Sequence, residues 1–188
     1  MGNVARAIVV GASSGIGAAV ARQLAADGAT IGLVARRVAQ LEVVKADVEA
    51  AGGSAIVVPH DVTDYDTVAG AFDALVSELG GLDLIVYAAG VMPSVDEHEY
   101  PFDKDRQMVE VSLLGAMAWL NPAAAYMEAA RSGAIVGISS IAGARGRRGN
   151  PGYGASKAAL TTWLEGLRNK ADRYGVRVVT VMPGFVDT

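Results

Sequence analysis

The sequence predicts an α/β fold in which a doubly wound parallel sheet carries helices on both faces. Three observations lead to this fold class. Short, uniformly apolar runs alternate along the chain with segments whose apolar residues recur every three or four positions. A glycine-rich turn directly follows the first apolar run. The length of 188 residues suits one core, so we expect a single domain over residues 1–188.

The first unit combines a strand with a glycine turn. Residues 7–10 are all apolar, as expected of a parallel strand that is covered on both faces. The turn then places Gly11, Gly15 and Gly17 in the spacing G-x-x-x-G-x-G. A glycine turn between a strand and a helix is typical of a dinucleotide site, because the missing side chains let the backbone approach a pyrophosphate at the helix N-terminus.

The helix after this turn is predicted from its apolar periodicity. Ile16, Val20 and Leu24 recur at four-residue spacing and predict a helix with one apolar stripe. Gly28 is placed to end the helix.

The remaining elements continue the same alternation. We expect further strands at 30–35, 55–58, 82–87, 134–138 and 176–181. We expect helices around Leu41, Val44 and Val48, around Val68, Phe72, Leu75 and Leu79, over about 103–130, and over about 153–174. With right-handed crossovers and the Rossmann-like strand order 3-2-1-4-5-6, a ligand would sit at the carboxyl ends of the strands.

Composition narrows the functional classes. The chain is 52% hydrophobic with a mean hydropathy of +0.32, which suits a buried sheet and a possible subunit interface. Its net charge of −4 gives no reason to expect a nucleic acid or an anionic membrane as partner. It has no cysteine, which excludes disulfides and thiol catalysis. No signal peptide precedes the first strand, so we expect a cytoplasmic protein.

A tyrosine and a lysine form the candidate proton-donor site. Lys157 follows Tyr153 by four residues, so on a helix both side chains share one face. A phenol has a reference pKa near 10 and is a poor acid–base group at neutral pH, but a fixed cation beside it favours the ionised form. At roughly 5 Å and an effective dielectric of about 20, one unit charge contributes about 3 kcal/mol.

Together with Ser140 and the glycine turn, this pair resembles the short-chain dehydrogenase/reductase family, in its compact single-domain branch. The likeness runs through Gly11 to Gly17, Asp61-Val62, Ala89-Gly90, Ile138-Ser139-Ser140, Tyr153 to Lys157, and Pro183-Gly184 with Val186 and Thr188. Family members usually continue into a substrate-covering segment and a seventh strand, and both are absent from this sequence.

The resemblance implies NADP(H) rather than NAD(H) as cofactor. Ala35 stands where an acidic residue usually binds the ribose of NAD, and Arg36 and Arg37 follow it. Arg36 would clamp the 2′-phosphate, with a hydroxyl contribution from Ser13. The implied cofactor-binding residues are Gly11, Ser13, Ser14, Gly15, Ile16, Gly17, Arg36, Arg37, Asp61, Val62, Ala89, Gly90, Tyr153, Lys157, Pro183, Gly184, Val186 and Thr188.

The resemblance also implies the reaction, which interconverts a small-molecule carbonyl compound and a secondary alcohol. Tyr153 would donate the proton, Ser140 would orient the carbonyl, and Lys157 would act on both the tyrosine and the nicotinamide ribose. Ser112 stands in place of the asparagine that usually orders a relay water. No metal site is expected, because the acidic segment 96–105 has no shared register.

Several alternatives remain open at this stage. A non-catalytic NADP-binding sensor or scaffold of the same fold is the main one, favoured by Ser112 and by Tyr87-Ala88 in place of the usual Asn-Asn. Arginines at 145, 147 and 148 are either solvated or meet an anionic substrate. We expect a homodimer or homotetramer. Its apolar contact would come from Met117, Trp119, Leu120, Trp163 and Leu164, unless these residues face the sheet of their own chain.

Overall fold

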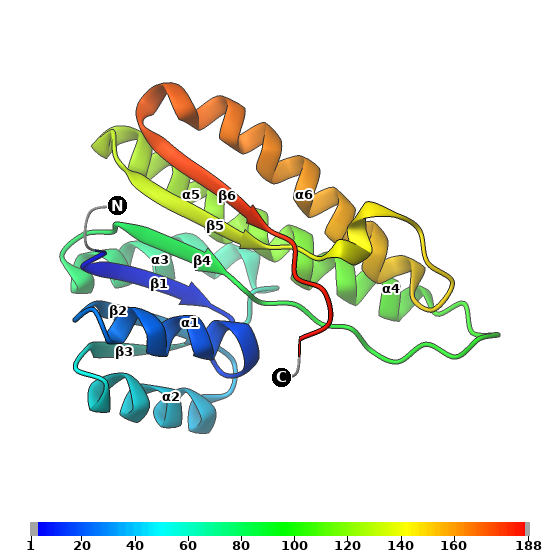
Figure 1. Cartoon of the computed structure of the whole chain (residues 1–188), viewed down its shortest axis with the longest axis horizontal. Coiled ribbons are helices and arrows are strands. Elements are labelled where there is room, and N and C mark those ends of the chain that lie inside the picture. The colour runs from blue at the N-terminus through cyan, green and yellow to red at the C-terminus, as the bar shows by residue number, and fades with distance from the viewer. Residues whose placement is uncertain (1–3, 187–188) are drawn as a thin grey trace.

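The computed structural model describes residues 4–186 and contains a six-stranded parallel sheet with the order β3-β2-β1-β4-β5-β6 (Figure 1). The strands are β1 (Arg6–Val10), β2 (Thr30–Ala35), β3 (Ser54–Pro59), β4 (Leu84–Tyr87), β5 (Gly133–Ile138) and β6 (Val176–Val181). The predicted Rossmann-like fold class and strand order are therefore confirmed.

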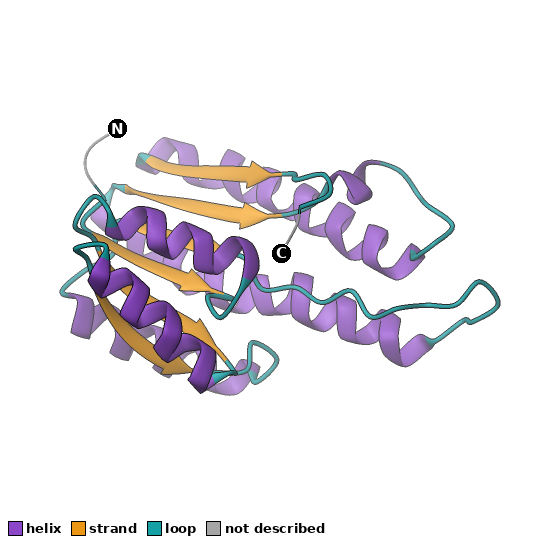
Figure 2. Cartoon of the chain, turned by 60° about the horizontal axis from the view of Figure 1, so that its bottom comes forward, coloured by secondary structure: helices purple, strands orange, loops and turns teal. Residues whose placement is uncertain are grey.

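Helices cover both faces of the sheet. They are α1 (Gly15–Ala25), α2 (Val38–Ala50), α3 (Tyr65–Leu79), α4 (Phe102–Val109), α5 (Gly115–Ala130) and α6 (Pro151–Ala171), with short segments η1 (Glu110–Leu114), η2 (Ile141–Ala144) and η3 (Asp172–Tyr174). One hydrophobic cluster joins α1 and α2 to one sheet face, and a second joins α3, α5 and α6 to the other. All strands point the same way, so their carboxyl ends meet at one edge (Figure 2).

The stripe of Ile16, Val20 and Leu24 on α1 is half-buried and packs against the hydrophobic cluster of this sheet face, where alanines such as Ala21 and Ala25 are fully buried. These small side chains let α1 lie close to the strands. The fourth strand begins at Leu84 rather than at residue 82.

The expected helix over 103–130 is not a regular α-helix throughout. Between α4 and α5 the chain forms the π-helical segment η1, and the Gly115 N–H bonds to the Glu110 carbonyl across five residues. The Tyr87 hydroxyl at the end of β4 donates a 2.6 Å hydrogen bond to the Val111 carbonyl in this segment. A Cβ on Gly115 would lie 2.5 Å from that hydroxyl oxygen, so the tyrosine fits only because residue 115 is glycine. Tyr87 thus ties the central sheet to η1.

The run Phe102–Ala130 also has the length and composition of a membrane-crossing helix, with a hydropathy of 1.2 over its most apolar window. A helix in a protein core meets the same criterion, and Trp119, Leu120 and Met127 of this run are fully buried against the sheet. Leu164 is fully buried as well. Trp119, Leu120 and Leu164 therefore do not supply the expected subunit contact. Their side chains face the sheet of their own chain, as the alternative interpretation predicted.

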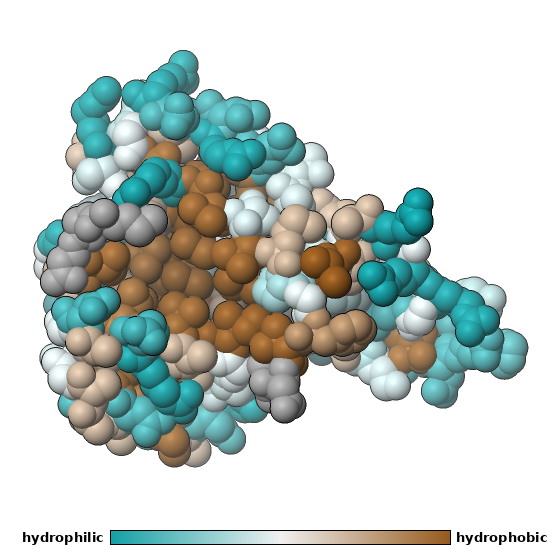
Figure 3. Space-filling model, viewed as in Figure 1, coloured by the Kyte–Doolittle hydropathy of each residue, from teal (hydrophilic) through white to brown (hydrophobic). Residues whose placement is uncertain are grey.

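Within residues 4–186, no helix covers one part of the sheet. On the face that α1 and α2 cover elsewhere, β5 and β6 are open, and an apolar surface is visible there (Figure 3). On this face Val179 and Val181 are 43% and 40% exposed, and Val136 beside them on β5 is half-buried. We call Val136, Val179 and Val181 the open apolar face.

Candidate functional site

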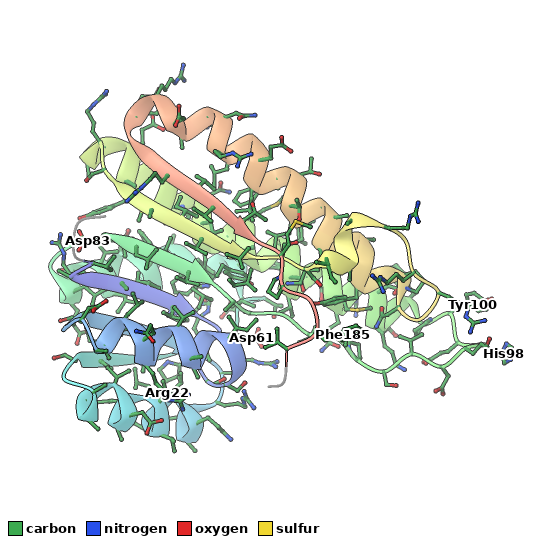
Figure 4. The ribbon with its side chains drawn as sticks, in the orientation of Figure 1. Arg22, Asp61, Asp83, His98, Tyr100 and Phe185 are labelled. Carbon is green, nitrogen blue, oxygen red and sulfur yellow. The ribbon has the colours of Figure 1, made fainter. Side chains whose placement is uncertain are left out.

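A cleft of about 1110 Å³ lies along the carboxyl ends of the strands. Every predicted cofactor-binding residue that the structure describes lines this cleft, and so does Ser140. Thr188, the last predicted cofactor contact, lies outside the described residues. Ser112 does not line the cleft and is fully buried behind it. Figure 4 shows Asp61 and Phe185 at this edge of the sheet.

The glycine turn forms a close-packed cradle at one end of the cleft. Gly11 has φ +89°, and a Cβ on it would lie 2.5 Å from the backbone nitrogen of Ala89. A Cβ on Gly17 would collide with the Gly11 carbonyl. Ser14 is the N-cap of α1, but its side chain makes no capping hydrogen bond. The helix therefore presents its N-terminal N–H groups and positive dipole end to the cleft, which suits a phosphate group.

The end of β2 adds two cations. Ala35 is buried at the strand end, so no carboxylate stands at this position. The Arg37 guanidinium donates hydrogen bonds to the Ser13 hydroxyl, at 2.9 and 3.2 Å, and to the Ser14 hydroxyl at 2.7 Å. Arg36 lies 3.4 Å from the Asp61 carboxylate. Arg37 therefore contacts the glycine turn, whereas Arg36, the residue expected to bind the 2′-phosphate, turns toward the end of β3.

The Asp61 carboxylate, just after β3, stays ionised. Burial alone raises its pKa, but hydrogen bonds from the Thr63 N–H and hydroxyl and the nearby Arg36 charge outweigh burial, so the pKa lies below its usual value. The Arg36–Asp61 pair is largely exposed, with 60% and 39% of the two side chains accessible. Exposed pairs contribute about 0–1 kcal/mol, so Arg36 can leave Asp61 at little cost.

Tyr153 and Lys157 share the inner face of α6, as their spacing predicted. The Lys157 ammonium nitrogen lies 5.8 Å from the centre of the Tyr153 ring and donates a 2.9 Å hydrogen bond to the Ile138 carbonyl at the end of β5. Lys157 is only 4% exposed, and burial lowers its pKa from 10.5 to about 8. At neutral pH the cleft therefore contains a buried cation beside the tyrosine.

Two adjacent serines at the end of β5 have different surroundings. The Ser139 hydroxyl donates to the Lys157 carbonyl at 2.9 Å or pairs with the Thr161 hydroxyl at 2.7 Å, which fixes β5 to α6. The Ser140 hydroxyl accepts a 3.1 Å bond from the Ala142 N–H, and its own proton has no acceptor in residues 4–186. Ser140 is thus the one of the two whose proton is available to a ligand.

Ser112 lies in η1, next to Lys157. It is fully buried, and its hydroxyl has no hydrogen-bond partner within the described part of the chain. A Cβ on Gly90 would lie 3.4 Å from the Lys157 ammonium nitrogen and 3.6 Å from the Ser112 oxygen, so both polar atoms flank the same glycine. A buried polar atom without a partner is uncommon and often marks a bound water.

Two residues of this site were missed at the level of sequence. Tyr87 was taken only as the loss of a usual asparagine, and its bond to η1 has no local sequence signal because residues 87 and 111 are far apart in the chain. Asn150 is the N-cap of α6, and its side-chain oxygen accepts a 3.1 Å bond from the Tyr153 N–H. An asparagine directly before a proline that opens a helix is a recognisable cap signal.

The arginines near the cleft divide into different roles. Arg148 pairs with Glu97 at 3.2 Å on the surface, and both side chains are mostly exposed. Arg147 lines the cleft, whereas Arg145 lies outside it, beside η2. Arg148 thus has the surface position of the solvated interpretation, and of the three arginines only Arg147 lines the cleft.

The cradle, the cations and the open helix terminus define a Rossmann-like protein with a cleft suited to a dinucleotide. The family follows from comparison with known proteins. The family model described as short chain dehydrogenase matches residues 5–188, and the chain belongs to this family of oxidoreductases. This confirms the resemblance noted in the sequence.

Named relatives agree with this assignment. A cis-4-hydroxycyclohexanecarboxylate dehydrogenase of Sinomonas cyclohexanicum is 40% identical over 97% of this chain and 73% of its own length. A metagenomic short-chain oxidoreductase solved in complex with NADP is 34% identical, with a TM-score of 0.90 over 96% of this chain and 82% of that one. An NAD⁺-bound xylitol dehydrogenase is 29% identical, with a TM-score of 0.93 over 98% and 71%. The neighbours thus include proteins with either cofactor.

Proposed function

We propose that this protein is an NADP(H)-dependent oxidoreductase that interconverts a small-molecule carbonyl compound and a secondary alcohol, with Tyr153 as proton donor and acceptor. The observation that carries the proposal is the convergence of Ser140, Tyr153 and Lys157 in the same cleft as the glycine cradle. The relative from Sinomonas, whose name states a hydroxylated ring as substrate, supports the reaction class.

The residues present fit a dinucleotide. The absence of side chains at Gly11 and Gly17 lets the turn pack closely against Ala89 and the start of α1, and the N-terminus of α1 suits the pyrophosphate. Arg36 and Arg37 at the end of β2 suit a 2′-phosphate. Asp61 and Val62 would hold the adenine, and Gly90, Pro183, Gly184 and Val186 the nicotinamide end. When bound, the reduced nicotinamide supplies the hydride.

The remaining chemistry belongs to side chains of this protein. Ser140 donates its free proton to the carbonyl oxygen and orients it. Tyr153 transfers its proton to the alkoxide that develops there. The Lys157 ammonium group stabilises the tyrosinate that remains, because it lies 5.8 Å from that ring in a poorly solvated position. A water between Ser112 and Lys157 would then return a proton from solvent.

The Tyr153→Phe variant tests the proton donor. It removes one hydroxyl and keeps the ring, so we expect turnover to fall about 10²-fold or more while NADPH affinity stays unchanged. The measurement is NADPH oxidation with a panel of ketones and diketones, and Tyr126→Phe on the exposed side of α5 serves as control. Normal turnover in Tyr153→Phe would refute the role. Tight NADPH binding by a wild type without turnover on the panel would favour the sensor alternative.

The Arg36→Asp variant tests the cofactor preference. We expect the wild type to bind NADPH more tightly than NADH, because two cations flank the 2′-position. Arg36→Asp removes a charged hydrogen bond and adds an acceptor for the ribose, so the ratio of the two dissociation constants should shift about tenfold or more toward NADH. Arg22→Ala is the control, since Arg22 pairs with Asp47 away from the cleft. Equal or tighter NADH binding by the wild type would overturn the preference.

We also propose a cytoplasmic, single-domain protein that forms a homodimer or homotetramer. Leu114 and Tyr126 on the outer side of the η1–α5 run are 39% and 37% exposed and supply apolar surface for a second copy. Met117 and Trp163 are half-buried in the isolated chain and add to it. Light scattering of the purified protein measures the oligomeric state directly, and a monomer at micromolar concentration would refute this part.

A further inference from the structure

The Asn150 side chain bridges two separate parts of the cleft wall. Its oxygen accepts a 3.1 Å bond from the Tyr153 N–H, in the first turn of α6. Its amide nitrogen donates a 3.1 Å bond to the Pro93 carbonyl. Pro93 belongs to the long segment between β4 and α4, 57 positions away in the sequence. One side chain therefore joins the helix of the proposed proton donor to a distant loop.

This loop forms one wall of the cleft. Residues 91–95 all line it, whereas the loop tip projects beyond the sheet, with His98 and Tyr100 far from Asp61 (Figures 2 and 4). The next carbonyl, that of Ser94, accepts a 2.8 Å bond from the Lys104 ammonium group on α4. The wall is thus held at adjacent residues, by Asn150 from α6 and by Lys104 from α4.

The chemistry of this bridge requires a side-chain amide. The Tyr153 N–H needs an acceptor and the Pro93 carbonyl needs a donor, and an amide offers both at once. Serine, threonine and aspartate cap helices well, but an ionised aspartate has no donor and a hydroxyl group has a shorter reach. The cap alone therefore does not account for asparagine at this position.

We propose that Asn150 is a positioning residue, which locks the loop 91–95 to the N-terminus of α6 and so sets the substrate end of the cleft around Tyr153. This inference rests on the proposed function, because it assigns the loop to the carbonyl substrate of that reaction. The proposed contacts for the pyrophosphate and the 2′-phosphate lie on α1 and at the end of β2, so a change at Asn150 should affect substrate binding far more than dinucleotide binding.

The Asn150→Asp variant separates the two bonds. It keeps the acceptor for Tyr153 and turns a carboxylate oxygen toward the Pro93 carbonyl, which frees the loop. We expect the KM for the carbonyl substrate to rise about tenfold, with a smaller change in kcat and an unchanged dissociation constant for NADPH. The carboxylate is ionised across pH 5–8, so the deficit should persist over this range. Asn150→Ser, whose hydroxyl group has a shorter reach, should show a similar deficit.

Arg148→Ala is the matched control. It removes the exposed ion pair between Arg148 and Glu97 on the same loop, and we expect wild-type kinetics. Equal KM and kcat values for Asn150→Asp and the wild type across pH 5–8 would overturn the inference.

Hydrogen exchange gives a second readout that does not depend on turnover. In Asn150→Asp the amides of residues 91–95 should exchange about tenfold faster, while those in the middle of α6 keep their wild-type rates. Unchanged exchange in the loop would overturn the inference even if the wild type is active. A wild type that binds NADPH but reduces no carbonyl compound would instead refute the proposed function, and loop exchange would still decide whether Asn150 holds the wall.

Discussion

At the scale of single residues, Lys157 couples the chemistry of the cleft to the stability of the fold. Burial lowers its pKa to about 8, below the 10.5 of an exposed lysine, so the folded protein at neutral pH holds a charge that the unfolded chain would solvate better. Between these two pKa values the unfolded chain binds the proton more tightly. The buried charge therefore lowers the free energy of unfolding by its full amount below about pH 8, and this destabilisation fades as the pH rises toward 10.5.

The Lys157→Met variant should therefore be inactive and yet more stable at pH 7. Removing the buried charge is worth on the order of 3 kcal/mol, and losing the hydrogen bond to Ile138 costs about 1 kcal/mol. The advantage over the wild type should shrink as the pH approaches 10. Urea unfolding at pH 7 and pH 9.5 measures this difference. The exposed Lys170→Met is the control, and a Lys157→Met protein less stable than the wild type at pH 7 would contradict the argument.

At the scale of elements, the π-helical segment η1 determines where the helix from α4 to α5 passes behind the cleft. The Tyr87 hydroxyl donates a hydrogen bond to the Val111 carbonyl of η1, and the absence of a side chain at Gly115 makes room for that hydroxyl. Such segments often occur at functional sites, and here the segment contains Ser112. The geometry makes Tyr87 and Gly115 an energetically coupled pair.

A double-mutant cycle on Tyr87 and Gly115 tests this coupling. Tyr87→Phe should cost about 1–3 kcal/mol, because the Val111 carbonyl loses its buried partner. Gly115→Ala should cost about 1–3 kcal/mol, because the new methyl group meets the hydroxyl at 2.5 Å and Val62 at 3.0 Å. The double variant should cost less than the sum, because the hydroxyl that clashes is gone.

The free energy of unfolding of all four proteins gives the coupling energy. Gly166→Ala on α6 is the control, since an added methyl group there meets nothing within 4 Å. It should stabilise the protein by up to about 1 kcal/mol through helix propensity. Strict additivity of Tyr87→Phe and Gly115→Ala would show that η1 does not depend on this contact.

The same elements show which features the sequence can predict. The β2 and β6 bounds match the expected ranges, because continuous apolar runs bounded by turn residues identify buried parallel strands. The interruption by η1 was missed, because it depends on Tyr87 from another strand and leaves no trace in helical periodicity. The apolar periodicity identified α1 and its half-buried stripe, but it gave no sign that Ala21 and Ala25 are buried completely, because that depends on how closely the helix packs on the sheet.

In the candidate site, too, the sequence predicted some features and missed those that depend on tertiary packing. Motif spacing predicted which residues line the cleft, since they lie at strand ends that a parallel sheet brings together. It did not predict side-chain pairing. The contacts of Arg37 with Ser13, of Ser139 with Thr161 and of Asn150 with Pro93 join elements whose relative positions are fixed only by tertiary packing.

At the scale of the whole molecule, the open apolar face predicts self-association. Val179 and Val181 expose large apolar side chains on a contiguous part of the sheet, and such patches favour contacts with other apolar surfaces. Val179→Lys should lower the binding of an apolar dye and the tendency to aggregate, and it should change the unfolding free energy by only about 0.5 kcal/mol. Val43, which is 60% exposed on α2, gives the control Val43→Lys. Equal effects of both variants would argue against a role for this face.

Strand β6 pairs only with β5 among the strands of residues 4–186, so its outer row of amide and carbonyl groups has no sheet partner there. Such a border can accept an added parallel or antiparallel strand from any polypeptide that reaches it. Because β6 leads directly to Pro183 and Gly184 in the cleft wall, a strand that docks on this border would also stiffen the wall. Binding of another polypeptide at this border would thus change the affinity of the cleft for its ligand through the backbone of the cleft wall.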